Sequence, residues 1–309
     1  MFDCDAIIVG GGPAGLAAGI YLSRAKRRTV LLDRDAFGGY IRNVELIENY
    51  PGFAEGVSGA KLASEMVNQA TRFGLRLEQT EVSAIELYSN CKYITCADGS
   101  GYTAAAVIIA GGARQKKLGV PGEEEFRGKG VFNCAFCDGG HFVDQVVAVC
   151  GGGDAGITEA LYMTKLASKV ILLEAMPALT ACAVLKEKAS ANPKMEIHCG
   201  TRVEAILGNG KVKAIEIAES QKGGKKTLAV DGVLVHIGLD ANTEYLADIL
   251  SLDGQGQIMA NNSMETDVSG IFAAGDIRSG SPRQVVTAVG DGATAAISAE
   301  RFLQGLDLG

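Results

Sequence analysis

Two cysteines separated by two residues stand in the stretch Cys134-Ala135-Phe136-Cys137. This spacing brings two sulfur atoms close enough for a reversible disulfide, and it lowers the pKa of one of the two thiols. Only a thiolate attacks a disulfide, so the pattern suits a protein that passes two electrons to a disulfide substrate. We therefore predict that Cys134 and Cys137 form a redox-active pair.

Two other interpretations of this pair compete with redox chemistry. Cys134, Cys137 and His141 have ligand-like spacing for zinc, but a structural site needs four ligands, and the sequence has no second Cys-x-x-Cys or matching histidine pair. Free cysteines are also commonly buried as small apolar side chains, so inert core thiols are the other alternative. We expect no metal site.

Length, composition and charge narrow the class of protein. The chain has 309 residues, which indicates about two domains, and 47% of them are hydrophobic, which is ample for buried cores. The net charge of −7 gives no basic surface, so we expect no nucleic-acid partner. The acidic start is unlike a signal peptide and the apolar runs are too short for a membrane span, so we expect no membrane partner and a cytoplasmic location.

The chain contains eight cysteines, and a cytoplasmic protein keeps structural thiols reduced, so we do not expect a disulfide framework. The cysteines in strand-like stretches are expected in the core, and these are Cys4, Cys91, Cys96, Cys150 and Cys199.

A strand–turn–helix–strand pattern begins at the sixth residue. The apolar run 6–9 leads into the glycine-rich turn 10–15, a helical stretch reaches about Ala25, and the apolar run 29–32 ends on Asp33. This order of elements is the one that a dinucleotide-binding fingerprint requires.

The same pattern returns in the middle of the chain. The apolar run 146–149 precedes the turn 151–156 and a helical stretch to about Leu166, and the run 170–173 ends on Glu174. In both copies the acid lies 18 residues after the third glycine (33 − 15 and 174 − 156).

The spacing predicts two nucleotide-binding turns. The first glycine makes the turn, the second admits the pyrophosphate, the third lets helix and strand pack, and the acid accepts from ribose hydroxyls. A glycine-rich turn without a ligand is the alternative, and it weighs more for the second copy. The residues concerned are Gly10, Gly12, Gly15 and Asp33 in the first copy, and Gly151, Gly153, Gly156 and Glu174 in the second.

Several further motifs resemble those of low-molecular-weight thioredoxin reductases, and the resemblance covers nearly the whole chain. The matching stretches are the turn 10–15, Glu48-Asn49-Tyr50-Pro51-Gly52, Val-Pro-Gly-Glu at 120–123, Cys-Ala-Phe-Cys-Asp-Gly at 134–139, the second glycine turn, and Ala-Ala-Gly-Asp at 273–276 with Arg283-Gln284.

The resemblance implies an α/β fold with two Rossmann-like nucleotide-binding domains of three layers (ββα), the second inserted into the first. It places a discontinuous FAD-binding domain in residues 1–114 and 244–309. The inserted pyridine-nucleotide-type domain, with the cysteine pair, would span 115–243. The family is typically a homodimer, which is the expected assembly here.

The resemblance also implies the cofactor contacts. The first glycine turn, including Pro13 and Ala14, would hold the FAD pyrophosphate, and Asp33 the adenosine ribose. Asn49 would lie near the flavin, and Asp276 would hold the ribityl or phosphate side. Arg283, Gln284 and Val285 would line the isoalloxazine, and the wider expected set adds Arg34, Gly39, Tyr40, Val82, Ala110 and Gly111.

The resemblance assigns roles to the reactive residues as well. Cys137 would face the flavin, Cys134 would attack the substrate disulfide, and Asp138 would be the acid–base group that manages the thiol proton. Thioredoxin is the disulfide partner implied. Two departures concern this machinery: Tyr40 stands where the family usually has Gln, and Phe136 replaces the usual Thr between the cysteines.

The electron donor is where the chain departs most. NADPH-using members carry His-Arg-Arg and a further Arg after the second strand of the inserted domain, whereas this chain has Glu174 followed by no cation until Lys186. A carboxylate repels a 2′-phosphate by about a few kcal/mol at an effective dielectric near 20. We therefore expect NADH slightly ahead of a non-nicotinamide donor such as ferredoxin, and NADPH third.

Two further functional alternatives remain. A dithiol oxidase related to thioredoxin reductase would close small-molecule dithiols with oxygen, but that group usually carries His at the position of Asp138. The other alternative is a non-catalytic flavin-binding module.

Overall fold

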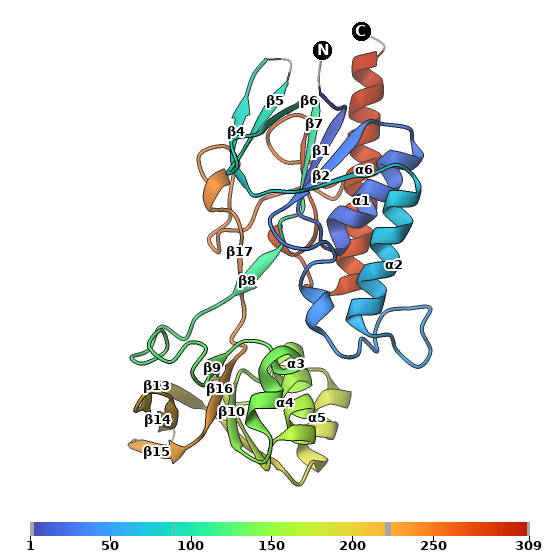
Figure 1. The fold of residues 1–309 in the computed structure, drawn as a ribbon. Coiled ribbons are helices and arrows are strands. Elements are labelled where there is room, and N and C mark those ends of the chain that lie inside the picture. The colour runs from blue at the N-terminus through green and yellow to red at the C-terminus, as the bar shows by residue number, and fades with distance from the viewer. Residues whose placement is uncertain (1–2, 90, 220–223, 308–309) are drawn as a thin grey trace. The chain divides into compact units, whose positions relative to one another are not determined.

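The computed structural model describes residues 3–89, 91–219 and 224–307, which divide into two compact units. The first unit combines residues 1–114 with 240–309, and the second is the continuous stretch 115–239 between them (Figure 1). Each unit has a parallel sheet, a small antiparallel sheet and helices. The predicted fold class, α/β with one Rossmann-like domain inserted into another, is confirmed.

The first unit is built on a five-stranded parallel sheet in the order β18-β7-β1-β2-β3. Helices α1, α2 and α6 run side by side along it, and an antiparallel sheet β4-β5-β6 forms a further layer (Figure 1). The bounds are β1 Ala6–Val9, α1 Pro13–Arg24, β2 Thr29–Asp33, α2 Gly59–Arg72, β3 Arg76–Gln79, β4 Val82–Leu87, β5 Lys92–Cys96, β6 Gly101–Ala104, β7 Ala106–Ile109, β18 Ile271–Ala273 and α6 Val285–Asp307, with the short 3-10 helices η1 Tyr40–Asn43, η3 Glu244–Leu246 and η4 Gly275–Ile277.

The alternation of side chains along β1 explains these layers. Ala6 and Ile8 belong to the apolar cluster that contains the inward faces of α1, α2 and α6. Ile7 and Val9 belong to a second cluster with residues of β4, β5 and β6. Because successive side chains of a strand point to opposite faces, a strand that is buried on both sides reads as a continuous apolar run.

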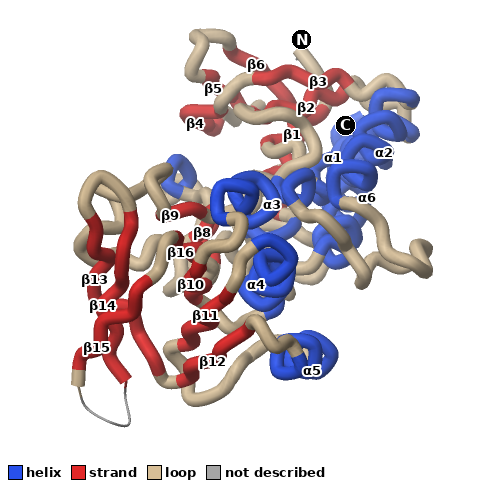
Figure 2. The backbone as a smooth tube through the Cα atoms, turned by 60° about the horizontal axis from the view of Figure 1, so that its bottom comes forward, coloured by secondary structure: helices blue, strands red, loops and turns tan. Residues whose placement is uncertain are grey.

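The second unit repeats the plan with its own parallel sheet, in the order β12-β11-β10-β16-β9. Figure 2 shows β13, β14 and β15 on one side of this sheet and α4 and α5 on the other, and the apolar clusters divide in the same way. The bounds are β9 Val131–Phe132, α3 Ala135–Asp138, η2 Gly139–Phe142, β10 Val146–Cys150, α4 Asp154–Leu166, β11 Lys169–Glu174, α5 Ala183–Ala191, β12 Met195–Cys199, β13 Thr201–Gly208, β14 Val212–Glu219, β15 Lys225–Ala229 and β16 Gly232–Val235.

The chain leaves and re-enters the first unit through two short strands that pair with each other, β8 (Ala113–Gln115) and β17 (Leu239–Ala241). The insert was expected to end at 243, but the compact unit ends at 239. Two contacts tie the following residues to the first unit: Ala241 packs in its core, and the Asn242 Nδ2 donates to the Gly111 carbonyl at 2.8 Å.

The cysteines outside the pair follow the core prediction only in part. Cys4, Cys96 and Cys150 are buried, whereas Cys91 is half-buried and Cys199 is exposed. The prediction is wrong for Cys199 because it ends β12, the edge strand of its sheet, where one flank has no neighbouring strand. Among the described residues, no helix is long and apolar enough to cross a membrane.

Two glycines of α6 offer a matched test of the packing in the first unit. A Cβ at Gly292 would overlap the carbonyl oxygen of Ala14 on α1, whereas a Cβ at Gly290 would meet nothing within 4 Å. We expect Gly292→Ala to lower the free energy of unfolding by about 1–3 kcal/mol, because the two helices must separate. Gly290→Ala should raise it by roughly 0.5–1 kcal/mol through helix propensity. Denaturant unfolding of the two variants measures both, and equal effects would contradict the close α1–α6 approach.

Candidate active site

The first glycine turn joins β1 to α1 with almost no space for side chains. Gly10 has φ +110, and a Cβ there would overlap the carbonyl oxygen of Ala110. A Cβ at Gly15 would overlap the carbonyl oxygen of Gly10, so helix and strand pack backbone to backbone. Gly12 caps α1 without a side chain, and Pro13 starts the helix. The helix N-terminus can therefore present backbone N–H groups to an anionic ligand.

Asp33 ends β2 and binds the turn itself. Its carboxylate accepts the N–H of Gly11 at 2.5 Å and the N–H of Asp35 at 2.8 Å. Burial raises the pKa of Asp33, and these two N–H groups act in the opposite direction. The acid of the fingerprint thus stabilises the turn before any ribose is bound.

The predicted flavin residues from distant parts of the chain meet in the first unit. Asn49 Nδ2 donates to Gln284 Oε1 at 2.9 Å, although the two lie 235 positions apart. Asp276 lies in η4 after the buried strand β18, burial raises its pKa, and the Ser281 hydroxyl donates to it at 3.4 Å. Arg283 takes the left-handed backbone conformation, with φ +57, directly before Gln284.

The other predicted cofactor residues lie in the same unit. Gly39 lies 3.9 Å from the position of a Cβ on Gly12, and Ala110 and Gly111 follow β7 beside Gly10. Arg34 forms ion pairs with Asp35 and Glu81. Val82 starts β4, Val285 starts α6, and Tyr40 starts η1 with 47% of its surface exposed.

An ion pair that no sequence motif predicted holds the Asp276 turn. Arg278 Nε lies 2.7 Å from Asp291 Oδ2, and both side chains are largely buried. The same carboxylate accepts the N–H of Gly275 at 3.1 Å. Arg278, which follows Gly275-Asp276 closely, was the one hint in the sequence. Its partner Asp291 lies on α6, and no spacing rule connects the two residues.

The second glycine turn repeats the geometry of the first. A Cβ at Gly151 would overlap the His236 carbonyl, and one at Gly156 would overlap the Gly151 carbonyl. Gly153 caps α4 as Gly12 caps α1. The Glu174 carboxylate, only 8% exposed, accepts the N–H groups of Gly152 at 2.6 Å and Met176 at 2.8 Å.

The chain after Glu174 folds back onto this turn. Thr180 and Ala181 donate their N–H groups to the Gly152 carbonyl at 3.0 and 3.1 Å, and Cys182 donates to the Asp154 carboxylate at 2.7 Å. In the first unit Gly38 makes the corresponding bond to the Gly11 carbonyl at 2.7 Å. The second turn therefore keeps the architecture of a dinucleotide site, but its charged side chains are acidic.

Cys134 and Cys137 form a disulfide at the start of α3. Cys134 is the N-cap residue, and its sulfur accepts the N–H of Cys137 at 3.0 Å. Cys134 is half-buried and Cys137 is exposed. Asp138 follows directly as the last residue of α3, half-buried. Phe136, which is 48% exposed, contacts the ring of Tyr162 on α4 at a centroid distance of 5.8 Å.

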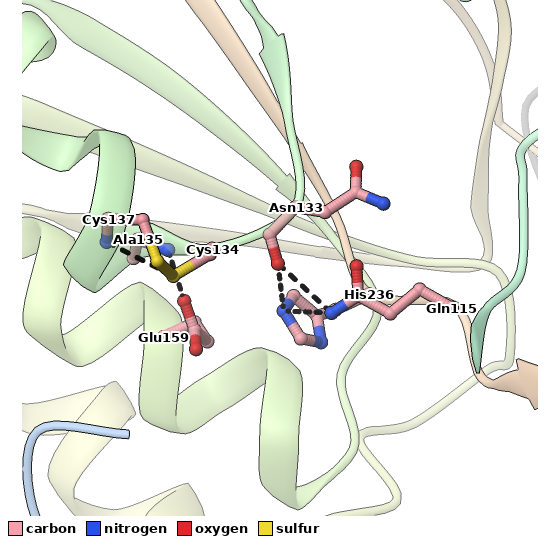
Figure 3. The surroundings of a disulfide bond; sticks show 7 residues. All are labelled: Gln115, Asn133, Cys134, Ala135, Cys137, Glu159 and His236. Atoms are coloured by element: carbon pink, nitrogen blue, oxygen red, sulfur yellow. Dashed lines mark hydrogen bonds between the residues drawn. A yellow bond between two sulfur atoms is a disulfide. The ribbon is translucent and has the colours of Figure 1, made fainter. Parts of the chain in front are cut away.

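Three contacts hold the peptides on either side of Cys134 (Figure 3). The Asn133 carbonyl accepts from Gln115 Nε2 at 3.0 Å and lies 3.2 Å from His236 Nε2. The Ala135 N–H donates to the Glu159 carboxylate on α4. Burial lowers the pKa of His236, which favours its neutral form. Within the part of the chain that the structure describes, no group of three or more histidine, cysteine or acidic side chains could hold a metal.

The fold and these sites define the class of two-domain flavoprotein disulfide oxidoreductases. Residues 4–292 match the pyridine nucleotide-disulphide oxidoreductase family, and the chain belongs to this family. It is 40% identical over 304 residues to the thioredoxin reductase of Treponema pallidum, which covers 98% of both chains.

Solved structures agree with this assignment. The thioredoxin reductase of Lactococcus lactis has a TM-score of 0.96 and 35% identity, covering 98% of this chain and 100% of its own. A ferredoxin-flavin thioredoxin reductase from Clostridium acetobutylicum has a TM-score of 0.55 and 27% identity over 99% of both chains. The resemblance to low-molecular-weight thioredoxin reductases is confirmed, and the chain is an FAD-dependent disulfide oxidoreductase.

Replacing Asp33 tests whether its carboxylate supports the binding of FAD. We expect Asp33→Ala to weaken FAD binding about 10- to 100-fold, because the Gly11 and Asp35 N–H groups lose their acceptor and the turn loosens. Asp35→Ala is the matched control, since it removes an exposed neighbouring carboxylate and keeps its own N–H. Fluorescence titration of the apoprotein with FAD measures both; equal dissociation constants would show that the Asp33 carboxylate does not support the site.

Proposed function

We propose that this protein is a thioredoxin-reductase-like enzyme that passes two electrons from a donor, through FAD and the Cys134–Cys137 pair, to a protein disulfide such as that of thioredoxin. The observation that carries the proposal is the bond from the Cys137 N–H to the Cys134 sulfur at 3.0 Å. A hydrogen-bond donor aimed at this sulfur favours the thiolate over the thiol.

The exchange chemistry follows from the pair. The Cys134 thiolate attacks one sulfur of the substrate disulfide, a mixed disulfide forms, and the other substrate sulfur leaves and takes a proton, for which Asp138 is the nearest acid in the sequence. Cys137 then attacks Cys134, which releases the second substrate thiol and restores the disulfide. Once bound and reduced by the donor, FAD would supply the two electrons that reduce the Cys134–Cys137 disulfide again.

Two observations support an order of preference for the electron donor. NADH comes first, a non-nicotinamide donor such as ferredoxin second, and NADPH third. The second glycine turn matches the first in its backbone contacts, which supports a dinucleotide ligand. Glu174 stands at the ribose position of that turn, Asp154 lies beside it, and the next cation in the sequence is Lys186. Two carboxylates, with no cation in the sequence between Glu174 and Lys186, disfavour a 2′-phosphate.

The first test of this function removes one sulfur at a time. We expect Cys134→Ser to lower disulfide reduction by ~1000-fold or more, because no thiolate remains to attack the substrate. Its flavin should still be bound and reducible. We expect Cys137→Ser to remove electron exchange between the dithiol and the flavin.

Cys182→Ser is the control, because Cys182 is an exposed cysteine of the same unit outside the pair. Full disulfide reduction by both pair variants would refute the function and leave a flavin-binding module. Oxygen-dependent closure of a small dithiol, without reduction of a protein disulfide, would favour the dithiol oxidase.

The second test compares electron donors under anaerobic conditions. We expect the flavin to be bleached at least ~10-fold faster by NADH than by NADPH, as Glu174 repels the 2′-phosphate. Reduction by dithionite shows that the flavin is competent. Equal rates, or a faster rate with NADPH, would overturn the argument from Glu174. If neither nucleotide reduces the flavin and reduced ferredoxin does, the donor is ferredoxin.

A further inference from the structure

Helix α4 carries a buried carboxyl group that contacts the turn of the redox pair and takes no part in the thiol–disulfide exchange. Glu159 is on α4, is only 8% exposed, and accepts the N–H of Ala135, the residue that follows Cys134 (Figure 3). Ala135 is fully buried in an apolar cluster that also contains Ala160 and Met163 of α4. The carboxyl group therefore enters an apolar contact between α3 and α4, where it accepts from the backbone N–H that begins α3.

Burying a carboxyl group is costly unless it is hydrogen-bonded. Burial raises the pKa of Glu159 to about 7, and the Ala135 N–H partly opposes this rise. The group thus changes its charge in the pH range in which a reactive thiol is deprotonated. The ionisable residues on the elements packed against α4 are Cys137 (in the reduced pair), Asp138, His141, Cys150, Lys169, Glu174, Lys186, Glu187 and Lys188, and α4 itself adds Asp154, Tyr162 and Lys165.

We propose that Glu159 is a positioning residue for the dithiol: its carboxyl group holds the Ala135 N–H and so fixes the turn that carries Cys134 and Cys137, and its negative charge opposes a thiolate at Cys134. The two effects act through different properties of one side chain. The anchor needs only an oxygen acceptor, whereas the electrostatic effect needs ionisation. The inference rests on the proposed use of the pair as a redox dithiol.

Two variants separate these effects. Glu159→Gln keeps an oxygen acceptor of nearly the same shape and removes the charge. Glu159→Met keeps the length of the side chain and removes both. Glu187→Gln on α5 is the control, because it removes an exposed carboxylate from the same unit.

The electrostatic effect is measured as the rate of alkylation of Cys134 by iodoacetamide against pH, in a Cys137→Ser background, with mass spectrometry of the peptide that contains Cys134. With Glu159 present, the thiol titration should be broad, because the carboxyl group ionises in the same range. With Glu159→Gln it should become a single titration with a lower midpoint, and alkylation at neutral pH should be about 3- to 10-fold faster. A profile that Glu159→Gln leaves unchanged would overturn the electrostatic role.

The anchor is measured as the equilibrium between the Cys134–Cys137 disulfide and dithiothreitol, with both cysteines present and at a pH of about 6, where most of the carboxyl group is protonated. Glu159→Gln should match the parent protein. Glu159→Met should shift the equilibrium roughly tenfold towards the dithiol, because the turn no longer holds the two sulfurs together.

If Glu159→Met leaves the equilibrium between the disulfide and dithiothreitol unchanged, the proposal that Glu159 holds the turn is wrong. If that variant does not fold, a Glu159→Gln equilibrium that departs from the parent protein by tenfold would overturn it instead, because the glutamine retains the acceptor. Glu187→Gln should match the parent in both measurements, and an equal effect there would overturn the assignment to Glu159. Both measurements use chemical reagents alone, so a failure of the proposed donor or protein substrate does not affect them.

Discussion

Both units depend on a turn in which a strand passes into a helix with no space for side chains. Gly15 lies against the carbonyl oxygen of Gly10, and Gly156 lies against that of Gly151. The acid at the end of the next strand then binds an N–H group within the turn. These contacts bring two strands and a helix together at one point. They leave the start of the helix available to an anionic group, which explains why a nucleotide site recurs in this position.

In both fingerprints, the acid that ends the second strand binds backbone N–H groups of its own turn. Both oxygens of Glu174 accept N–H groups of its own chain, at Gly152 and Met176, as Asp33 does at Gly11 and Asp35. An acidic residue at this position therefore indicates that the chain forms this turn. It does not identify the nucleotide that the turn binds. Discrimination between nucleotides then depends on the charges around the turn, which in the second unit include the carboxylates of Asp154 and Glu174.

Helix α4 connects the second nucleotide turn with the redox pair. Its N-terminus follows Gly153, and the next turn of the helix carries Glu159, which binds the peptide between the two cysteines. The peptide before Cys134 is held separately, through the Asn133 carbonyl. The dithiol is therefore positioned by contacts with the backbone on both sides of Cys134.

The sequence by itself determined the local features. Apolar runs and glycine spacing predicted β1, α1, β2 and their second copies, because these patterns depend on residues that are neighbours in the chain. The Cys134–Cys137 spacing predicted the pair for the same reason.

Only the tertiary structure decided which distant side chains meet. The partnership of Asn49 with Gln284, that of Arg278 with Asp291, and the burial of Glu159 under Ala135 join segments whose separation in space is fixed when the layers pack. No periodicity within one segment encodes such a partner.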